Sequence, residues 1–193
     1  IEAPEGRSLP ALLAPQLRQA MLRMSRNKKA QEGAKRALRA LAGFAKSLKV
    51  KFADIEVGLD FDPEPGLADN GDLEHDLQVL LEAVGAAAQK AETALVLFID
   101  GLQYVDEAEL AILIRAMNHC IQRRVPVMLV GAGLPQLRGH MGNAKSYAER
   151  LFDFPEIGPL NTVAARLAIT QPVTDQGMKI VAEAADMIVA ESQ

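Results

Sequence analysis

The feature that most constrains the fold is a run of six apolar residues, Ala94–Ile99, that ends at Asp100. The run is too short for an ordinary helix and is rich in branched side chains, which is typical of a buried strand in a parallel sheet with both faces covered. Ligands of open parallel sheets bind beyond the carboxyl ends of the strands, so Asp100 is the first candidate for chemistry. An Asp after a strand can equally be a turn or helix-capping residue, and both interpretations stay open.

A second strand is predicted for Val125–Val130, after a helix that begins near Asp106 and ends at Arg124. A strand, a helix and a strand at this spacing predict one right-handed parallel unit. We therefore expect an α/β fold, a parallel sheet with helices on both faces. Apolar residues at helical spacing predict further helices that begin near Ser8, after Lys29, at Asp72, at Asn161 and at Asp175.

Two more stretches alternate with the period of a strand. Val50–Phe61 predicts a short hairpin or a bulged strand, and Leu151–Ile157 predicts a third, less apolar strand of the sheet. The opening residues from Ile1 to Pro4 are similar to the tail of a strand, so we expect the chain to be a piece of something longer. Cys120 borders the apolar face of its helix and is interpreted as a small core residue. His75, His119 and His140 are too far apart to predict a metal site.

Charge is distributed unevenly along the chain. The net charge is −4, yet the segment Arg18–Lys51 holds eleven Lys or Arg and one acid, Glu32. Such a segment predicts either a nucleic-acid contact or a solvated helix face near acidic neighbours of the same protein, and its few aromatic residues favour the second. The chain has no apolar run long enough to span a membrane, and its single cysteine is compatible with the cytoplasm. We expect a cytoplasmic protein that does not bind membranes.

The stretch from Leu97 to Gln103, Leu-Phe-Ile-Asp-Gly-Leu-Gln, resembles the Walker B segment of AAA-type and signal-transduction P-loop ATPases, the group that includes origin-recognition-type proteins. The resemblance implies that Asp100 holds Mg²⁺ through water beside ATP, and that Gln103 lies at the same nucleotide site. It also puts Gly131, after the second strand, at the sensor 1 position near the terminal phosphate. Gly131 and Gly133 are otherwise interpreted as turn residues.

The sequence departs from the pattern of this family at three places. Gly101 stands where the family has the Glu that polarises the attacking water, and Glu107 lies too far along the chain to be assumed a substitute. Gly131 brings no polar side chain to the sensor position. No Gly-x-x-x-x-Gly-Lys-Ser/Thr motif occurs in the 193 residues, so the P-loop and the strand before it are missing. The resemblance therefore implies a parent that binds and hydrolyses ATP, and a fragment that does not bind ATP tightly.

The segment around Arg150 is similar to the Box VII region of the family, in which an Arg before a Phe acts as an arginine finger on a neighbouring subunit. A surface Arg paired with Glu149 or Asp153 is the alternative. By the same resemblance, residues 1–160 form a truncated AAA-type ATPase core and residues 161–193 begin a helical lid. We expect a homo-oligomer, with DNA or a protein as partner through the parent. A catalytically inactive, ATPase-like interaction module and a nucleic-acid-binding piece that uses Arg18–Lys51 are the other functions that the sequence leaves open.

Overall fold

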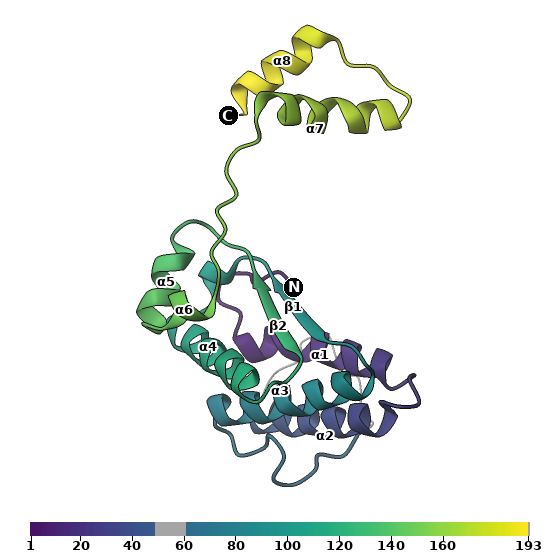
Figure 1. Ribbon diagram of the computed structural model, residues 1–193, viewed down its shortest axis with the longest axis vertical. Helices are drawn as coiled ribbons and strands as arrows, with labels where there is room; N and C mark the ends of the chain where they lie inside the picture. Colours follow the sequence, from purple (N-terminus) through teal and green to yellow (C-terminus); the bar gives the residue numbers. More distant parts are fainter. Residues whose placement is uncertain (49–60, 193) are drawn as a thin grey trace. The chain divides into compact units, whose positions relative to one another are not determined.

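The computed structural model of the chain describes residues 1–48 and 61–192. The chain divides into two compact units, Ile1–Phe154 and Pro155–Gln193, so the division falls six residues before the boundary expected at residue 160. The first unit contains both strands and most of the helices. Its elements are α1 (Leu9–Met24), α2 (Gln31–Ser47), α3 (Leu73–Lys90), β1 (Leu95–Ile99), the short 3-10 helix η1 (Leu102–Tyr104), α4 (Glu107–Gln122), β2 (Val127–Gly131), α5 (Leu137–Ala144) and α6 (Ala148–Leu151) (Figure 1).

The sheet confirms the central sequence prediction, because β1 and β2 are parallel and hydrogen-bonded neighbours, with Leu95 opposite Val127 and Ile99 opposite Gly131. The first residues of the chain lie along the other edge of β1. Glu2 forms an isolated parallel bridge with Asp100, whose backbone N–H donates to Ile1 O at 2.9 Å and whose carbonyl accepts from Ala3 N at 2.9 Å. The order across the sheet is therefore the N-terminal segment, β1 and then β2.

Only one face of this sheet is covered by helices within the described part of the chain, so the expectation of two covered faces was wrong. Burial alternates strictly along β1, where Leu95, Leu97 and Ile99 are buried in the core with α3 and α4. The other face carries Val96, Phe98, Met128 and Val130, and all four side chains are exposed. We call these four residues the open sheet face. A run of apolar residues shows that both faces of a strand carry apolar side chains. It does not show whether helices of the same chain cover both of these faces.

Local capping signals placed the helices well. The side chain of Asp72 accepts from His75 N at the start of α3, and that of Asp106 accepts from Ala108 N at the start of α4. Ser8 is the N-cap position of α1, although its side chain makes no capping hydrogen bond. The helices α2 and α3 pack closely, since a β-carbon placed on Gly33 would lie 3.2 Å from Ala87 Cα. On the covered side of the sheet α3 and α4 contact the strands, and α1 and α2 pack against α3 (Figure 1).

The structure corrects two sequence predictions, and a third falls on residues that it does not describe. Leu151 ends α6 and no strand follows it, because Pro155 and Pro159 remove backbone donors that a ladder would need. In the second unit, α7 (Thr162–Asp175) ends at Asp175, where a helix was expected to begin, and α8 (Ala182–Glu191) starts seven residues later. Gly177, with φ +71°, breaks the helical path between them. The hairpin expected at Val50–Phe61 lies almost wholly outside the described residues.

Candidate functional site

The carboxyl ends of β1 and β2 meet at one edge of the sheet, and Asp100 lies there directly after β1. Its side chain is exposed, and one of its oxygens, Oδ1, accepts from the backbone N–H of Gly101 at 2.8 Å. The bond is a local turn bond of the kind that Asp commonly makes. The second oxygen, Oδ2, makes no hydrogen bond or ion pair to the described residues. Asp100 thus combines the two interpretations drawn from the sequence, since it closes a turn and still presents a free oxygen.

The loops after β1 and β2 are joined by hydrogen bonds across this edge. Leu102 N donates to Ala132 O at 3.1 Å, and Ala132 N donates to Ile99 O at 2.8 Å. Gln103 reaches the same loop through its side chain, whose Oε1 accepts from Leu134 N at 3.3 Å. The structure therefore brings Asp100, Gln103 and Gly131 to one edge, although Gly131 belongs to a different strand from the one that Asp100 and Gln103 follow.

Gly131, the last residue of β2, and Gly133 in the loop after it are needed for packing against η1. A β-carbon on Gly131 would overlap the side chain of Leu102, which is almost fully buried. A β-carbon on Gly133 would lie 2.6 Å from Gln103 Oε1 and 2.8 Å from Leu137 Cδ2. The space that these glycines leave is thus filled by side chains of the same chain. This geometry agrees with their interpretation as turn residues and gives no open cradle for a phosphate.

The residues at this edge fit only part of an ATP and Mg²⁺ site. A free carboxylate oxygen on Asp100 suits a hydrated Mg²⁺ ion, which prefers oxygen ligands and keeps several of its waters. In the described part of the chain, no three His, Cys, Asp or Glu side chains gather as metal ligands, so Asp100 would hold such an ion without a second or third protein carboxylate. The phosphate contacts of a nucleotide have no counterpart among these residues.

Arg150 lies on neither of the two segments that form this edge. It lies on the short helix α6 and is exposed, and its guanidinium makes no hydrogen bond or ion pair with the described residues. The expected alternative partner Glu149 instead contacts Arg138, whose Nε lies 3.4 Å from Glu149 Oε1. Arg138 also lies over the ring of Phe154, at 5.8 Å from its centroid. Arg138 thus takes the structural role considered for Arg150.

A hollow of about 430 Å³ lies beside this edge and was missed by sequence reasoning. Its wall includes Tyr104 from η1 and Glu109 from α4. Glu109 Oε2 accepts from Leu9 N at 2.7 Å and so holds the first turn of α1. Burial raises the pKa of Glu109, although the hydrogen bond from Leu9 opposes the shift. The remaining lining residues are Gly6, Arg7, Ser8 and Asp106. In the sequence, the only indication of this hollow was Arg7, a charged residue shortly before the start of a helix.

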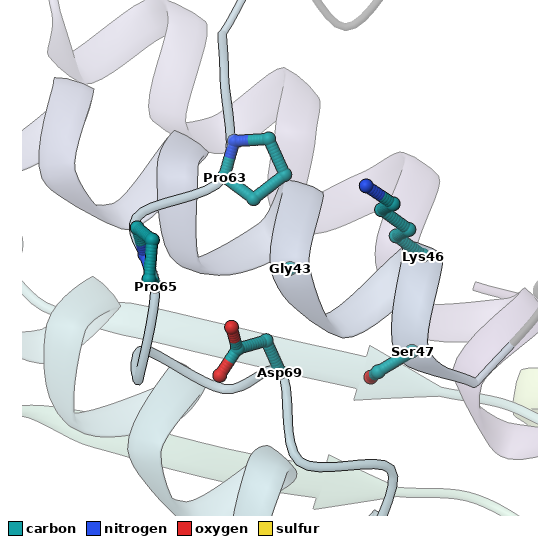
Figure 2. A pocket seen from close by; sticks show the side chains of 6 residues that line it. All are labelled: Gly43, Lys46, Ser47, Pro63, Pro65 and Asp69. Carbon is teal, nitrogen blue, oxygen red and sulfur yellow. The ribbon is translucent and has the colours of Figure 1, made fainter.

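A second hollow, of about 440 Å³, lies at the C-terminal end of α2 and is shown in Figure 2. Lys46 and Ser47 line it from the helix, and Pro63, Pro65 and Asp69 line it from the following loop. Asp69 Oδ2 accepts from Gly66 N at 3.1 Å, so its carboxylate is engaged in the loop itself. Ser47 and Asp69 thus have structural partners, whereas Lys46 forms no ion pair with the described residues, and we assign this hollow no chemistry.

Comparison of the chain with protein-family models, with curated proteins and with solved structures found no match. No helix in the described part of the chain combines the length and the hydropathy that crossing a bilayer requires. Function must therefore be argued from the edge of the sheet and from the surfaces around it.

Proposed function

We propose that this chain forms the Walker B half of a P-loop-type ATPase domain, and that ATP binding requires a strand and a P-loop that its 193 residues do not contain. One observation carries the proposal. Asp100 follows the middle segment of a three-segment parallel arrangement, and Gln103 from the next turn bonds to the loop after β2. A carboxylate at that point is where an open parallel sheet exposes a ligand site.

The unpartnered surfaces of the sheet also support this proposal. Two backbone hydrogen bonds flank the ladder between β1 and β2: Leu95 N donates to Pro126 O, and Ala132 N donates to Ile99 O. The backbone N–H and C=O groups of the even-numbered residues of β2 therefore point toward β1. The polar backbone groups of Leu129 and Gly131 therefore point away from β1, to the outer edge. This edge adjoins the open sheet face. A further parallel strand and an apolar helix after it, the pair that the resemblance expects before Ile1, would cover both surfaces.

A titration with Mg-ATP tests the proposal. The 193-residue chain should show no binding tighter than about 1 mM by calorimetry, which corresponds to roughly −4 kcal/mol. The same chain extended at Ile1 by a strand and a P-loop should bind Mg-ATP in the micromolar range. Micromolar binding by the unextended chain, or none by the extended one, would contradict the proposal.

A matched pair of variants in the extended chain tests the role of Asp100. Asp100→Asn should weaken Mg²⁺-dependent nucleotide binding at least tenfold, because it removes the carboxylate that balances the charge of the metal. Asp106→Asn removes the same charge at the same edge, where its side chain caps α4. It should leave nucleotide binding unchanged. Equal losses in the two variants would mean that nucleotide binding depends on the total negative charge near this edge and not on Asp100 itself.

A second function, an ATPase-like module without hydrolysis, is favoured by Gly101. No side chain is present there to orient an attacking water, and Glu107 lies at the start of α4. In the extended chain, Gly101→Glu should raise turnover well above the parent if the missing carboxylate is the only defect. Turnover equal to the parent in this variant would show that another residue already does this work.

A further inference from the structure

The basic residues of the segment Arg18–Lys51 differ in their partners. Four of the nine that the structure describes form ion pairs with acids of the same chain: Lys29 with Glu92, Lys35 with Glu32, and both Arg36 and Arg39 with Glu64. Five have no acid within ion-pair distance among the described residues, namely Arg18, Arg23, Arg26, Lys28 and Lys46. The interpretation of the segment as a solvated face near acidic neighbours therefore holds for the middle of α2, around Arg36 and Arg39.

Three of the unpaired residues, Arg23, Arg26 and Lys28, lie in or beside the tight turn between α1 and α2. The turn is closed by backbone bonds from Arg26 N to Arg23 O and from Ala30 N to Asn27 O. All three side chains are exposed. A turn of this length keeps their charges within a few residues of one another, at the C-terminal end of α1, where cations are favoured by the helix dipole.

The fold adds a lysine from a distant part of the chain to this turn. Lys90, in the last turn of α3, lies against the first turn of α2, since a β-carbon placed on Gly33 would be 3.5 Å from Lys90 Cδ. Lys29 reaches the loop after α3, where its Nζ lies 2.7 Å from Glu92 Oε1. We call Arg23, Arg26, Lys28, Lys29 and Lys90 the basic end. Glu92 is the acid that contacts it, so five cations face one carboxylate.

The basic end lies at the opposite end of the sheet from Asp100. The helix α3 runs into β1 through a short turn, so Lys90 is near the beginning of β1, while Asp100 follows its end. The helix α1 begins at the Asp100 side, where Leu9 N donates to Glu109, and it ends at the basic end. A partner held at the basic end would therefore leave the Asp100 edge free.

The chemistry of the basic end favours a polyanion. Among the described residues before Val96 no large apolar side chain is exposed, so this surface offers no apolar centre for a protein interface and nothing to insert into a membrane. Among the same described residues no exposed aromatic ring is present on which the bases of a single strand could stack. Long flexible cations without such neighbours suit the phosphates of a duplex, which need no base contact.

We propose that the basic end binds the phosphate backbone of double-stranded nucleic acid without sequence preference. The proposal is independent of the proposed ATPase function, because it uses no residue of the Asp100 edge. Lys29 is paired with Glu92, so four cations of the basic end have no acid partner among the described residues. Four phosphate contacts predict a slope of roughly −3.6 for the logarithm of the association constant against the logarithm of salt concentration. Raising the salt from about 50 to about 200 mM should then weaken binding roughly 150-fold.

Fluorescence anisotropy of the 193-residue chain with a labelled 20-base-pair DNA duplex, in the absence of nucleotide, tests this proposal. Lys90→Gln should reduce the magnitude of the salt slope by about 0.9, since it removes one phosphate contact. Arg23→Gln combined with Arg26→Gln and Lys28→Gln should reduce it by about 2.7. Arg39→Gln is the matched control, because it removes one charge from the same segment at a residue near Glu64. It should leave the slope unchanged. Circular dichroism checks that each variant is folded.

The outcomes separate the possible partners. Equal effects of Lys90→Gln and Arg39→Gln would overturn the proposal, because binding would then follow the charge of the segment and not the basic end. Binding to vesicles that contain about one-third phosphatidylserine, without binding to the duplex, would also overturn it in favour of a membrane surface. No binding to duplex DNA at about 50 mM salt would overturn it outright.

Discussion

A β-carbon placed on Gly101 would lie 3.0 Å from the carbonyl oxygen of Ala3, so the backbone around it leaves little room for a side chain at this position. Gly101 has φ +74°, a left-handed conformation that side chains disfavour. It turns the chain from β1 into η1 while the N-terminal segment passes close by. The glycine is thus needed for the local path of the chain, whatever its effect on hydrolysis.

This relationship predicts that Gly101→Ala destabilises the fold by about 1–2 kcal/mol, the usual cost of a side chain in the left-handed region. Urea unfolding measures the change. Gly139→Ala is the control, since Gly139 lies in α5 with open space around it and should gain up to about 1 kcal/mol from the better helix propensity of Ala. If Gly101→Ala left the unfolding free energy unchanged, the turn would have relaxed around the new side chain, and Gly101→Glu in the extended chain would be free of backbone strain.

The carboxylate of Asp76 holds the loop before α3 against the end of α2. It is fully buried, and it accepts from Ser47 Oγ at 3.2 Å, Asn70 N at 3.2 Å and Gly71 N at 2.9 Å. Asp76→Ala should cost about 2–4 kcal/mol of unfolding free energy, because it leaves several donors without an acceptor. Asp62→Ala, at an exposed position in the same loop, should change stability by less than about 0.5 kcal/mol. Similar losses in both variants would contradict this role for Asp76.

The sequence predicted best those features that depend on neighbouring residues. Helices were expected to begin at Asp72, near Asp106 and at Asn161, and each of these side chains accepts a backbone N–H in the first turn of its helix. Cys120 was expected in the core and is fully buried, and desolvation raises the pKa of its thiol to about 11. Capping and helical burial follow from spacing alone, because the partner lies within one turn.

The features that the sequence missed depend on residues far apart in the chain. The open sheet face could not be predicted, since an apolar strand has the same pattern whether one or two of its faces are covered. The prediction of a third strand at Leu151–Ile157 was wrong for a related reason. Alternating apolar residues do not show whether a neighbouring strand is present to pair with them. The position of Lys90 beside the turn after α1 depends on the packing of α2 against α3 at Gly33. At the candidate site, Asp100 was found from its own strand, whereas the bond from Leu134 to Gln103 required the second loop.

The contacts of Glu82 on α3 with the C-terminal end of α4 predict a pH dependence of stability. Glu82 Oε1 lies 2.9 Å from Arg123 Nε and 2.7 Å from His119 Nε2. The hydrogen bond from Arg123, with a further one from His119, lowers the pKa of Glu82, against a partial burial that raises it. A carboxyl whose pKa is lowered on folding stabilises the fold above the ordinary value of 4.5, and this contribution is lost as the pH falls through the lowered pKa.

Glu82→Gln should therefore reduce the unfolding free energy at pH 7 by about 0.5–1 kcal/mol, a modest effect because these side chains are partly exposed to solvent. The difference from the wild type should shrink as the pH falls below 4.5. Chemical unfolding across this range measures it, with Glu5→Gln, at an exposed position, as the control that should show no difference at any pH. A difference that stays constant with pH would show that Glu82 acts through packing and not through its charge.

The open sheet face and the outer edge of β2 predict that the chain associates with itself. Phe98 and Met128 are 63% and 58% exposed and lie on the same face, next to backbone groups of β2 that have no strand partner in the described part of the chain. Apolar surface beside an unpaired edge is a ready site for pairing with another chain.

Sedimentation equilibrium should show a mass that rises with protein concentration. Phe98→Lys combined with Met128→Lys should weaken this association at least tenfold, because charged side chains on a strand surface oppose pairing. Ile157→Lys removes an apolar side chain that is 97% exposed elsewhere in the chain, and should leave the association unchanged. A wild-type chain that stays monomeric at high concentration would show that this surface is stable in water, and would remove the argument that a further strand and helix must cover it.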